Sequence, residues 1–338
     1  ENRPGCDSLY IPGRRSLMYR VSYFHRRVNL EMFHVLADGT GGLVFFRRLI
    51  ENYLTAAHGL SRKNEDTDRA SAAEHTDDAF RHFYGKERSS AQLRKLALRR
   101  AYHIRQEKDD YMLNHLLEVC VSAKAFVALA HRRKTTAGVL MVAMYIRAVA
   151  ETMSERDKKF PVVVSVPVNL RQYFPSATMR NFFGVIAVAY DAREYDGTLE
   201  GIVERVREAF AAQLHIENIR DTMNGYSALE HNIGIKFIPL FIKDKGISFF
   251  SGRTRRGTTS LMSNLGVVSM DEAFAPYIDR FSGFMSSENV QICAMTYEDK
   301  LTFGAVSAYQ THGVLMRFFR ELTSAGLHAE LGTNDYDA

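Results

Sequence analysis

A change in hydrophobic spacing near residue 38 limits what this chain can fold into more than any other feature. Residues 28–33 alternate apolar and polar side chains, which predicts a strand with one buried face. Residues 43–54 instead carry apolar side chains at helical spacing. Between them lies a glycine-rich turn that contains His34 and Asp38. Functional side chains are often placed in loops at the ends of such rigid elements, so these two residues are the first site candidates.

The rest of the sequence predicts a mixed α/β protein of two lobes. Residues 61–79 lose nearly all periodicity, which predicts a mobile surface linker. We therefore expect an N-terminal lobe in 1–114 and a C-terminal lobe in 115–338. Strands are predicted at 17–24, 115–121, 161–167, 182–190, 258–268, 277–285, 290–297 and 301–306, and helices at 123–132, 136–153 (with Thr135 or Thr136 as N-cap), 198–214 and 314–327, while the apolar region 235–250 is of uncertain type.

Composition indicates a folded chain without a membrane span. The chain has 338 residues, of which 46% are hydrophobic and 25% charged, enough to bury a sizeable core. Its longest apolar run, 137–146, is too short to cross a bilayer, and residues 1–8 do not read as a signal peptide. Cys6, Cys120 and Cys293 lie far apart, which favours buried thiols in a reducing compartment. A cytoplasmic location is therefore expected.

The charge pattern argues against nucleic-acid binding. Lysine and arginine together number 44 against 39 acidic residues, which gives a net charge of +5. The basic pairs are scattered along the chain, whereas a nucleic-acid surface gathers them on one face. A mild positive excess suits a phosphate-bearing small molecule or an acidic carrier protein.

Several other chemistries lack their patterns. A dinucleotide fold would need a third glycine where Val44 stands, so Gly39 and Gly41 are instead expected to allow a positive φ or a close approach of the backbone. There is no GxSxG, HExxH, Walker A or EF-hand spacing, and residues 5–9 only approach a GDSL hydrolase box. A possible metal set lies in or beside the predicted linker and is expected to be solvated, so no metal is predicted: His75, Asp77, Asp78 and His82.

The pattern His-x-x-x-Asp-Gly at 34–39 resembles the signature of the coenzyme A-dependent acyltransferase superfamily. This superfamily includes chloramphenicol acetyltransferase, alcohol acetyltransferases, polyketide-associated acyltransferases and nonribosomal peptide condensation domains. Residues 169–176 and 180–184 resemble the Asn-Leu-Arg … Arg-Asn-Phe-Phe-Gly block of bacterial alcohol acetyltransferase-like proteins, and 258–266 resembles their Ser-Asn-Leu-Gly strand. The resemblance covers about 17–327, although the superfamily normally has a further strand and helix before the hairpin, which is predicted here from the strands at 17–24 and 28–33.

The resemblance implies a two-lobed, chloramphenicol acetyltransferase-like fold with an interlobe tunnel. The expected activity is transfer of an acyl group from a thioester, on coenzyme A or a phosphopantetheine arm, to a hydroxyl or amine. His34 would act as general base without an acyl-enzyme, because histidine takes up and returns protons near neutral pH. Phe33 stands where the double-histidine form has its first histidine. The thioester would be a co-substrate, and no bound cofactor is expected.

Further site roles also follow from the resemblance. Asp38 would pair with Arg171, with Arg180 as the reserve partner, and Gly39 would shape the turn that carries the histidine. An unpaired buried carboxylate is costly, so Asp38 needs such a partner. Three residues are candidates for oxyanion or substrate binding, with hydrogen bonding at a strand edge as the alternative: Ser263, Asn264 and Asn181.

Two alternatives remain open at this stage. The cluster of Arg253, Arg255 and Arg256 would receive donor phosphates or the acidic face of a carrier protein, or it would simply be solvated. The whole chain would be either an acyltransferase or a non-catalytic, condensation-domain-like protein that binds a carrier protein or another partner.

Overall fold

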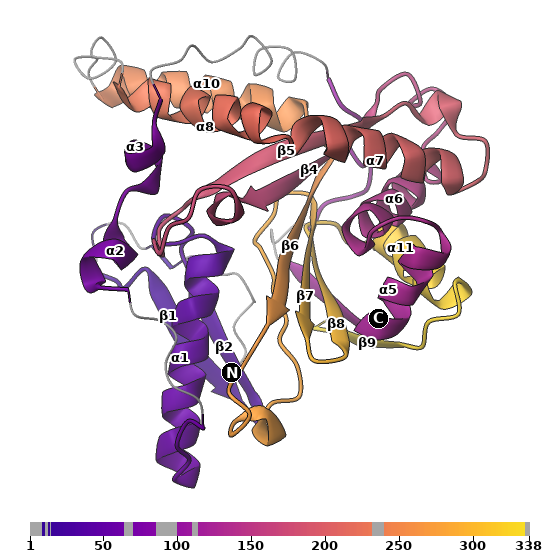
Figure 1. The fold of residues 1–338 in the computed structure, drawn as a ribbon. Coiled ribbons are helices and arrows are strands. Elements are labelled where there is room, and N and C mark those ends of the chain that lie inside the picture. The colour runs from indigo at the N-terminus through magenta and orange to yellow at the C-terminus, as the bar shows by residue number, and fades with distance from the viewer. Residues whose placement is uncertain are drawn as a thin grey trace.

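The computed structural model describes residues 9, 10, 13, 15–63, 70–85, 100–109, 114–231 and 240–334 (Figure 1). Over these ranges the chain forms a seven-stranded mixed sheet and a separate two-stranded hairpin. The mixed α/β class that the sequence predicts is confirmed. None of the described helices combines the length and hydropathy that a membrane crossing requires.

The large sheet has the strand order β5-β4-β6-β7-β8-β3-β9. The pairs β4–β6 and β6–β7 are parallel and the other neighbouring pairs are antiparallel. Most of the predicted strands are found within a residue or two of their expected bounds, but the last strand was not predicted. The strands are β3 (His115–Ser122), β4 (Val162–Asn169), β5 (Phe183–Tyr190), β6 (Ser260–Val268), β7 (Val290–Tyr297), β8 (Lys300–Ser307) and β9 (Ala329–Thr333).

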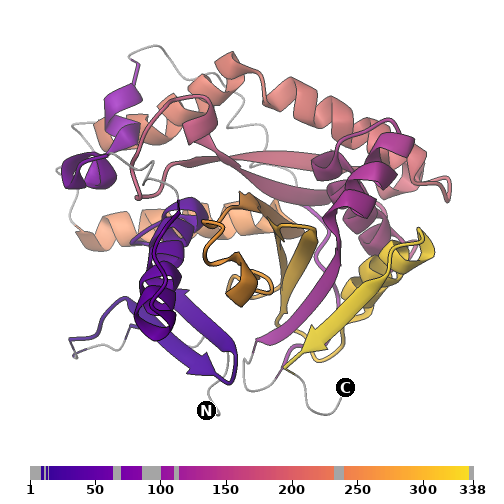
Figure 2. The same cartoon turned by 60° about the horizontal axis from the view of Figure 1, so that its bottom comes forward.

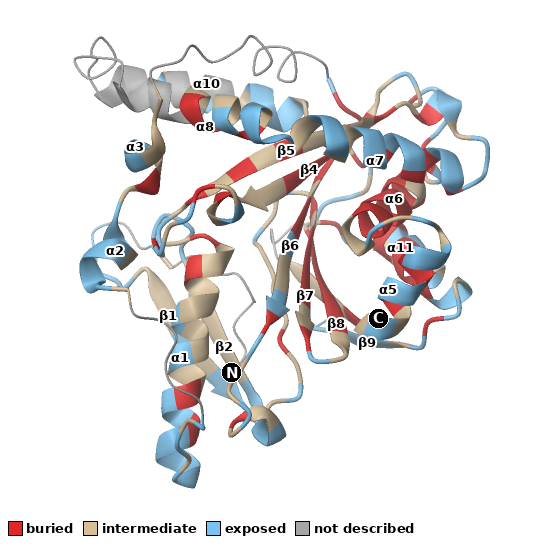
Figure 3. Ribbon diagram, in the orientation of Figure 1, coloured by how far each residue is buried: buried red, intermediate tan, exposed pale blue. Residues whose placement is uncertain are grey.

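A layer of helices covers one face of this sheet and forms the main core (Figures 1 and 3). Its members are α5 (Ala123–Arg132), α6 (Ala137–Ala150), α7 (Glu200–Gln213) and α11 (Gly313–Ser324). Helix α6 is apolar nearly all round because it is buried on nearly all sides, and the Thr136 side chain accepts a hydrogen bond from the Val139 amide at its start. At the edge strand β5, the Gln213 side chain bonds both the amide and the carbonyl of Ala187, as a neighbouring strand would.

The strand predicted at 277–285 is wrong, because this segment lies across the second face of the sheet without joining it. The segment is irregular in the structure and its apolar side chains, such as Phe281, pack among β6 and β7 residues. It approaches so closely that a Cβ on Gly304 would lie 2.1 Å from the Gly283 carbonyl oxygen. The apolar pattern that suggested a strand thus reflects burial against a sheet face.

The N-terminal unit consists of the antiparallel hairpin β1 (Tyr19–Phe24) and β2 (Arg27–Met32) together with α1 (Gly39–His58) (Figure 2). The helix rests on the hairpin through contacts such as the edge-on pair of the Tyr19 and Phe45 rings. In Figures 1 and 2 this unit lies on the opposite side of the large sheet from α5, α6 and α11. The division at 114 and 115 stays a prediction.

Four further helices complete the described chain: α2 (Ala72–Thr76), α3 (Ala79–Phe83), α8 (Ile216–His231) and α10 (Leu240–Arg256). Helix α2 lies inside the expected linker and begins with a capping box formed by Ser71 and Glu74. Helix α2 is hydrogen-bonded to the loop at 176–179, because the Met179 amide donates to the His75 carbonyl. Helix α10 occupies most of the uncertain region 235–250, of which 235–239 lie outside the described residues, as does Cys6.

Candidate functional site

The candidate site lies where two parallel strands separate. Strands β4 and β6 are paired only where Val164 faces Ser260 and Ser165 faces Leu261. Beyond that point β4 continues to Asn169, while β6 continues to Val268 alongside β7 with an irregularity between Asn264 and Val267. The two strands therefore form a fork, and the start of α1 contacts residues from both of its sides.

Two glycines allow the first turn of α1 to enter this fork. A Cβ on Gly41 would lie 1.9 Å from the Met179 carbonyl oxygen, in the loop that follows β4. A Cβ on Gly39 would lie 2.4 Å from Cδ2 of Leu265 on β6. Neither glycine has a positive φ. Of the two reasons expected for these glycines, close approach is therefore correct and a left-handed backbone is wrong.

Asp38 joins this turn to the larger sheet. Its side chain is 6% exposed and accepts a hydrogen bond from the Gly41 amide, which makes it the N-cap of α1. It also accepts from the Phe182 amide at 2.9 Å and from the Arg171 guanidinium at 2.8 Å and 3.3 Å. The ion pair expected between Asp38 and Arg171 is present, and both charges are satisfied by several donors or acceptors.

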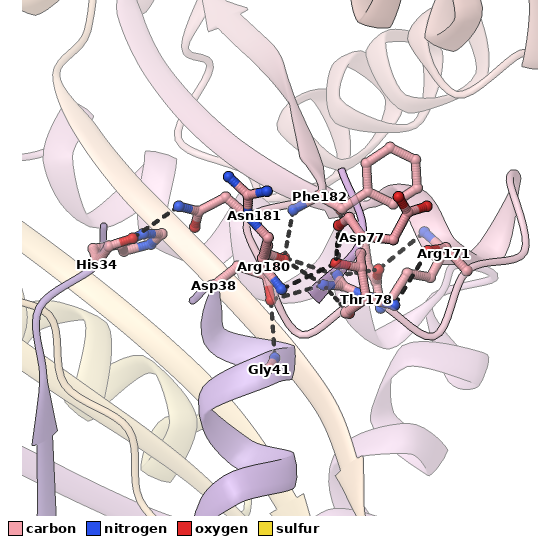
Figure 4. Close-up of polar contacts among 11 residues, drawn as sticks. His34, Asp38, Gly41, Asp77, Arg171, Thr178, Arg180, Asn181 and Phe182 are labelled. Atoms are coloured by element: carbon pink, nitrogen blue, oxygen red, sulfur yellow. Dashed lines mark hydrogen bonds and ion pairs between the residues drawn. The ribbon is translucent and has the colours of Figure 1, made fainter. Parts of the chain in front are cut away.

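Arg171 holds the loop after β4 as well as Asp38. Its guanidinium donates to the backbone carbonyls of Thr178, Arg180 and Phe182 (Figure 4). Arg180, the reserve partner, thus contributes its carbonyl, while Arg171 makes the pair with Asp38. A single guanidinium therefore fixes both the loop and the aspartate that begins α1.

His34 lies in the turn between β2 and α1 and is exposed. The Asn181 side-chain amide donates to the His34 backbone carbonyl at 2.9 Å, and the imidazole packs edge-on to Phe183 with ring centroids 5.7 Å apart. In Figure 4, His34 lies on one side of Asp38 and Arg171 on the other. The turn is therefore held through its backbone, which leaves the imidazole accessible.

The polar residues of β6 have local partners in this structure. Ser263 is buried beside Cys293 of β7 and hydrogen-bonds its thiol, whose pKa burial raises to about 12. The Asn264 side chain accepts from the Gly266 amide at 2.9 Å. The oxyanion role of both stays a prediction. Asn181 differs from them, since its Oδ1 atom is buried and has no hydrogen-bond partner among the described residues.

The structure does not bring the arginine cluster at 253–256 to His34. Its members are exposed on the last turn of α10, where Arg255 pairs with Glu288 at 2.7 Å. Arg256 lines a hollow with Arg100 and His103, and its backbone carbonyl accepts a hydrogen bond from the Ala101 amide. This position is at the beginning of β4, whereas Asp38 and Arg171 are at its end. The donor role of this cluster stays a prediction.

One cationic site was missed by the sequence reasoning. A hollow beside α1 is lined by Arg47, Arg48, Arg62, His75 and Arg171, among others. The possible metal residues near it have structural contacts: His75 Nδ1 lies 3.1 Å from the Ala177 carbonyl, and Asp78 caps α3. Only the Arg47-Arg48 pair and the capping box at 71–74 were available as local signals, because the hollow unites three distant segments.

Comparisons with known proteins identify the fold. No protein-family model matches this sequence, and no curated protein matches it. Among solved structures, the chain is similar to TRI101 of F. sporotrichioides complexed with coenzyme A and T-2, at 13% identity and a TM-score of 0.51, over 90% of this chain and 67% of that one. It is also similar to the nonribosomal peptide synthetase FmoA3 bound to AMPPNP, at 15% identity and a TM-score of 0.54, over 88% of this chain and 30% of that one.

These likenesses show the mixed α/β fold that the resemblance predicted, and the interlobe tunnel stays a prediction. The chain has the mixed α/β fold of the TRI101 and FmoA3 structures. It spans about two thirds of the TRI101 chain and less than a third of the FmoA3 chain.

Proposed function

We propose that this chain transfers an acyl group from a thioester to a hydroxyl or amine acceptor, with His34 as the general base. The observation that carries the proposal is the way the histidine is held. Its turn is fixed from one side by Asn181 and from the other by Asp38, while the imidazole itself stays accessible. A proton-transfer group needs this combination of a rigid backbone and a reachable side chain.

In the proposed reaction the acceptor attacks the thioester carbonyl directly. The imidazole of His34 takes the proton of the acceptor hydroxyl or amine as the new C–O or C–N bond forms. The C–S bond then breaks, and the imidazolium returns the proton to the departing thiolate. Such a base contributes about 10² to 10⁴-fold in rate. No acyl-enzyme is required.

The donor would be acyl-coenzyme A or an acyl-phosphopantetheine carrier. The net charge of +5 and the crystallisation of TRI101 with coenzyme A support a phosphate-bearing donor. Oxyanion stabilisation is assigned to the polar groups beside the fork, and loss of one such donor typically costs about 2.7 to 4 kcal/mol of transition-state stabilisation. Because the Asn181 amide nitrogen already bonds the His34 carbonyl, Asn181 would act mainly by positioning the turn.

The test is a mass-spectrometric screen of acetyl- and longer acyl-coenzyme A donors with mixed alcohols and amines. His34→Ala should abolish product formation with a nearly unchanged melting temperature, because the side chain is exposed. His131→Ala, an equally exposed histidine on α5, is the matched control and should keep full activity. Full activity in His34→Ala would refute the proposal.

A second candidate function is a non-catalytic binding protein for a carrier protein or another partner. It is favoured by one observation, that neither the hollow beside α1 nor the one at Arg256 includes His34. In addition, the imidazole makes no hydrogen bond with the described residues. Carrier binding that survives in His34→Ala, together with no turnover of any donor by the unaltered protein, would favour this alternative.

A further inference from the structure

The hollow beside α1 has the composition of an anion site. It has a volume of about 280 Å³ and lies between the first half of α1, Arg62, α2 and the loop at 176–179. This volume is near the lower end of the range for small-molecule sites, which suits a small ligand or one group of a larger ligand. Four arginines line it, together with His75, Thr40 and Ser176, and Glu51 is the single carboxylate among the described residues that line it.

One of the arginines that line the hollow takes no part in an ion pair with the described residues. The buried carboxylate of Glu51 pairs with Arg62 and, at 3.7 Å, with Arg48. Arg171 is engaged by Asp38. Arg47 forms no ion pair with the residues that the structure describes, and its Nε atom is buried without a hydrogen-bond partner. One guanidinium in this hollow therefore lacks the acceptor that a buried donor needs.

A phosphate group matches this arrangement best. Phosphate oxygens accept the forked donors of arginine in pairs, and hydroxyl groups supply further donors. An apolar or cationic ligand would leave the Arg47 donor unsatisfied.

We propose that this hollow binds a phosphate group, either as free phosphate or as part of a phosphate ester such as coenzyme A. The site is separate from His34, since it lies at the Arg171 end of the polar network around Asp38. Its wall is the loop at 176–179, whose Thr178 carbonyl accepts from Arg171. Bound phosphate would therefore stabilise this loop and, through Arg171 and Asp38, the turn that carries His34.

The proposal does not depend on acyl transfer, so it is tested by binding alone. Isothermal titration at constant ionic strength would use inorganic phosphate in one arm and coenzyme A in the other. Arg47→Gln should weaken the binding of at least one of them by about tenfold or more, because one charge-assisted contact is lost. The variant should fold normally, since the Arg47 Nε atom has no hydrogen bond to lose within the part of the chain that the structure describes.

Three variants make the test specific. Arg156→Gln removes the same charge from an exposed position between α6 and β4 and should bind like the unaltered protein. Arg256→Gln acts at the other basic hollow and should also leave binding unchanged. Ser176→Asp keeps an acceptor for the Thr178 amide while it places a carboxylate in the hollow, so it should weaken binding as Arg47→Gln does.

The two arms also identify the source of the phosphate. Loss of inorganic phosphate binding in Arg47→Gln would identify a site for the free ion, and loss of coenzyme A binding alone would identify a site for the ester. Either result supports the proposal. It is overturned if neither ligand binds the unaltered protein, if Arg47→Gln binds both ligands as tightly as before, or if Arg256→Gln alone removes binding.

Discussion

The large sheet and the N-terminal unit bury their apolar side chains very differently. The sheet and its helices enclose a continuous core in which whole aromatic side chains are removed from water, among them Phe126, Tyr145, Phe303 and Phe318. The described part of the N-terminal unit instead exposes many of its large apolar residues, and in Figure 3 its hairpin is tan and pale blue with no buried residue. These include Leu17, Val21, Tyr23, Phe24, Phe33, Val35, Leu36, Phe45 and Tyr53.

This difference shows what holds His34 in place. Apolar burial stabilises the large sheet. The N-terminal unit packs Leu43 and Phe46 of α1 against a smaller apolar cluster that includes Phe281, and at the fork it is attached through specific polar and steric contacts. These contacts are the ion pair of Asp38 with Arg171, the close approach of Gly41 to Met179 and the bond from Asn181 to His34. The candidate base therefore lies at the junction of the two regions, and its position depends on a few residues.

The largest contrast is expected from core truncation. Phe318→Ala should lower the free energy of unfolding by about 3 to 5 kcal/mol, because the ring is fully buried against Tyr145 and Phe303. Tyr23→Ala in the hairpin should change it by less than about 0.5 kcal/mol, since that side chain is 74% exposed. Denaturant unfolding measures both, and similar losses in the two variants would show that the hairpin is buried in solution.

The ion pair at the junction should give the next largest effect. Asp38→Asn should destabilise the protein by about 3 kcal/mol and also reduce activity, because Arg171 loses its buried charge partner. Glu200→Gln is the control, since its pair with Arg133 on the helical layer is exposed and should contribute less than about 1 kcal/mol. If the two variants lost equal stability, Asp38 would not be the residue that joins the two regions.

Local patterns predicted the elements whose burial is regular. The bounds of α5 and β7 agree with the sequence, and Thr136 is the N-cap of α6, because period and capping chemistry are set by neighbouring residues. The pair of Asp38 and Arg171 was predicted only through the family resemblance, since the two are 133 positions apart. No local pattern contains that contact.

The errors have different physical origins. The strand expected at 277–285 has apolar residues that face a sheet, and burial alone does not reveal whether the backbone is paired. Helix α2 was missed although Ser71 and Glu74 form a capping box that the sequence displays. The cationic hollow could not be predicted, because it depends on how α1, α2 and the loop at 176–179 meet.

The two glycines at the start of α1 lie at the steric contacts between the two regions. Gly41→Ala should cost about 2 kcal/mol, because its Cβ would overlap the backbone carbonyl of Met179 and force the two regions apart. Gly39→Ala should cost less, since its Cβ meets only the end of the flexible Leu265 side chain. Thermal unfolding and the activity of each variant would measure this, and the reverse order would contradict the assigned contacts.

The smallest effect concerns a largely buried carboxylate in the helical layer, Glu321 on α11. Unlike Asp38, its Oε1 atom has no hydrogen bond among the described residues, and the nearest cation, Arg147, is 3.4 Å away. Burial raises the pKa of Glu321 from 4.5 to about 7, although Arg147 opposes the shift. The folded state therefore binds this proton more tightly than the unfolded state, and stability should fall as pH rises from about 4.5 through 7.

Glu321→Gln should remove that decline and be more stable than the unaltered protein at pH values above this window, by on the order of 1 kcal/mol. Glu208→Gln, in an exposed pair with Arg205, is the control. If the stability of Glu321→Gln and of the unaltered protein changed equally between these pH values, the Glu321 carboxyl would be solvated. The two regions would then satisfy their buried charges equally well.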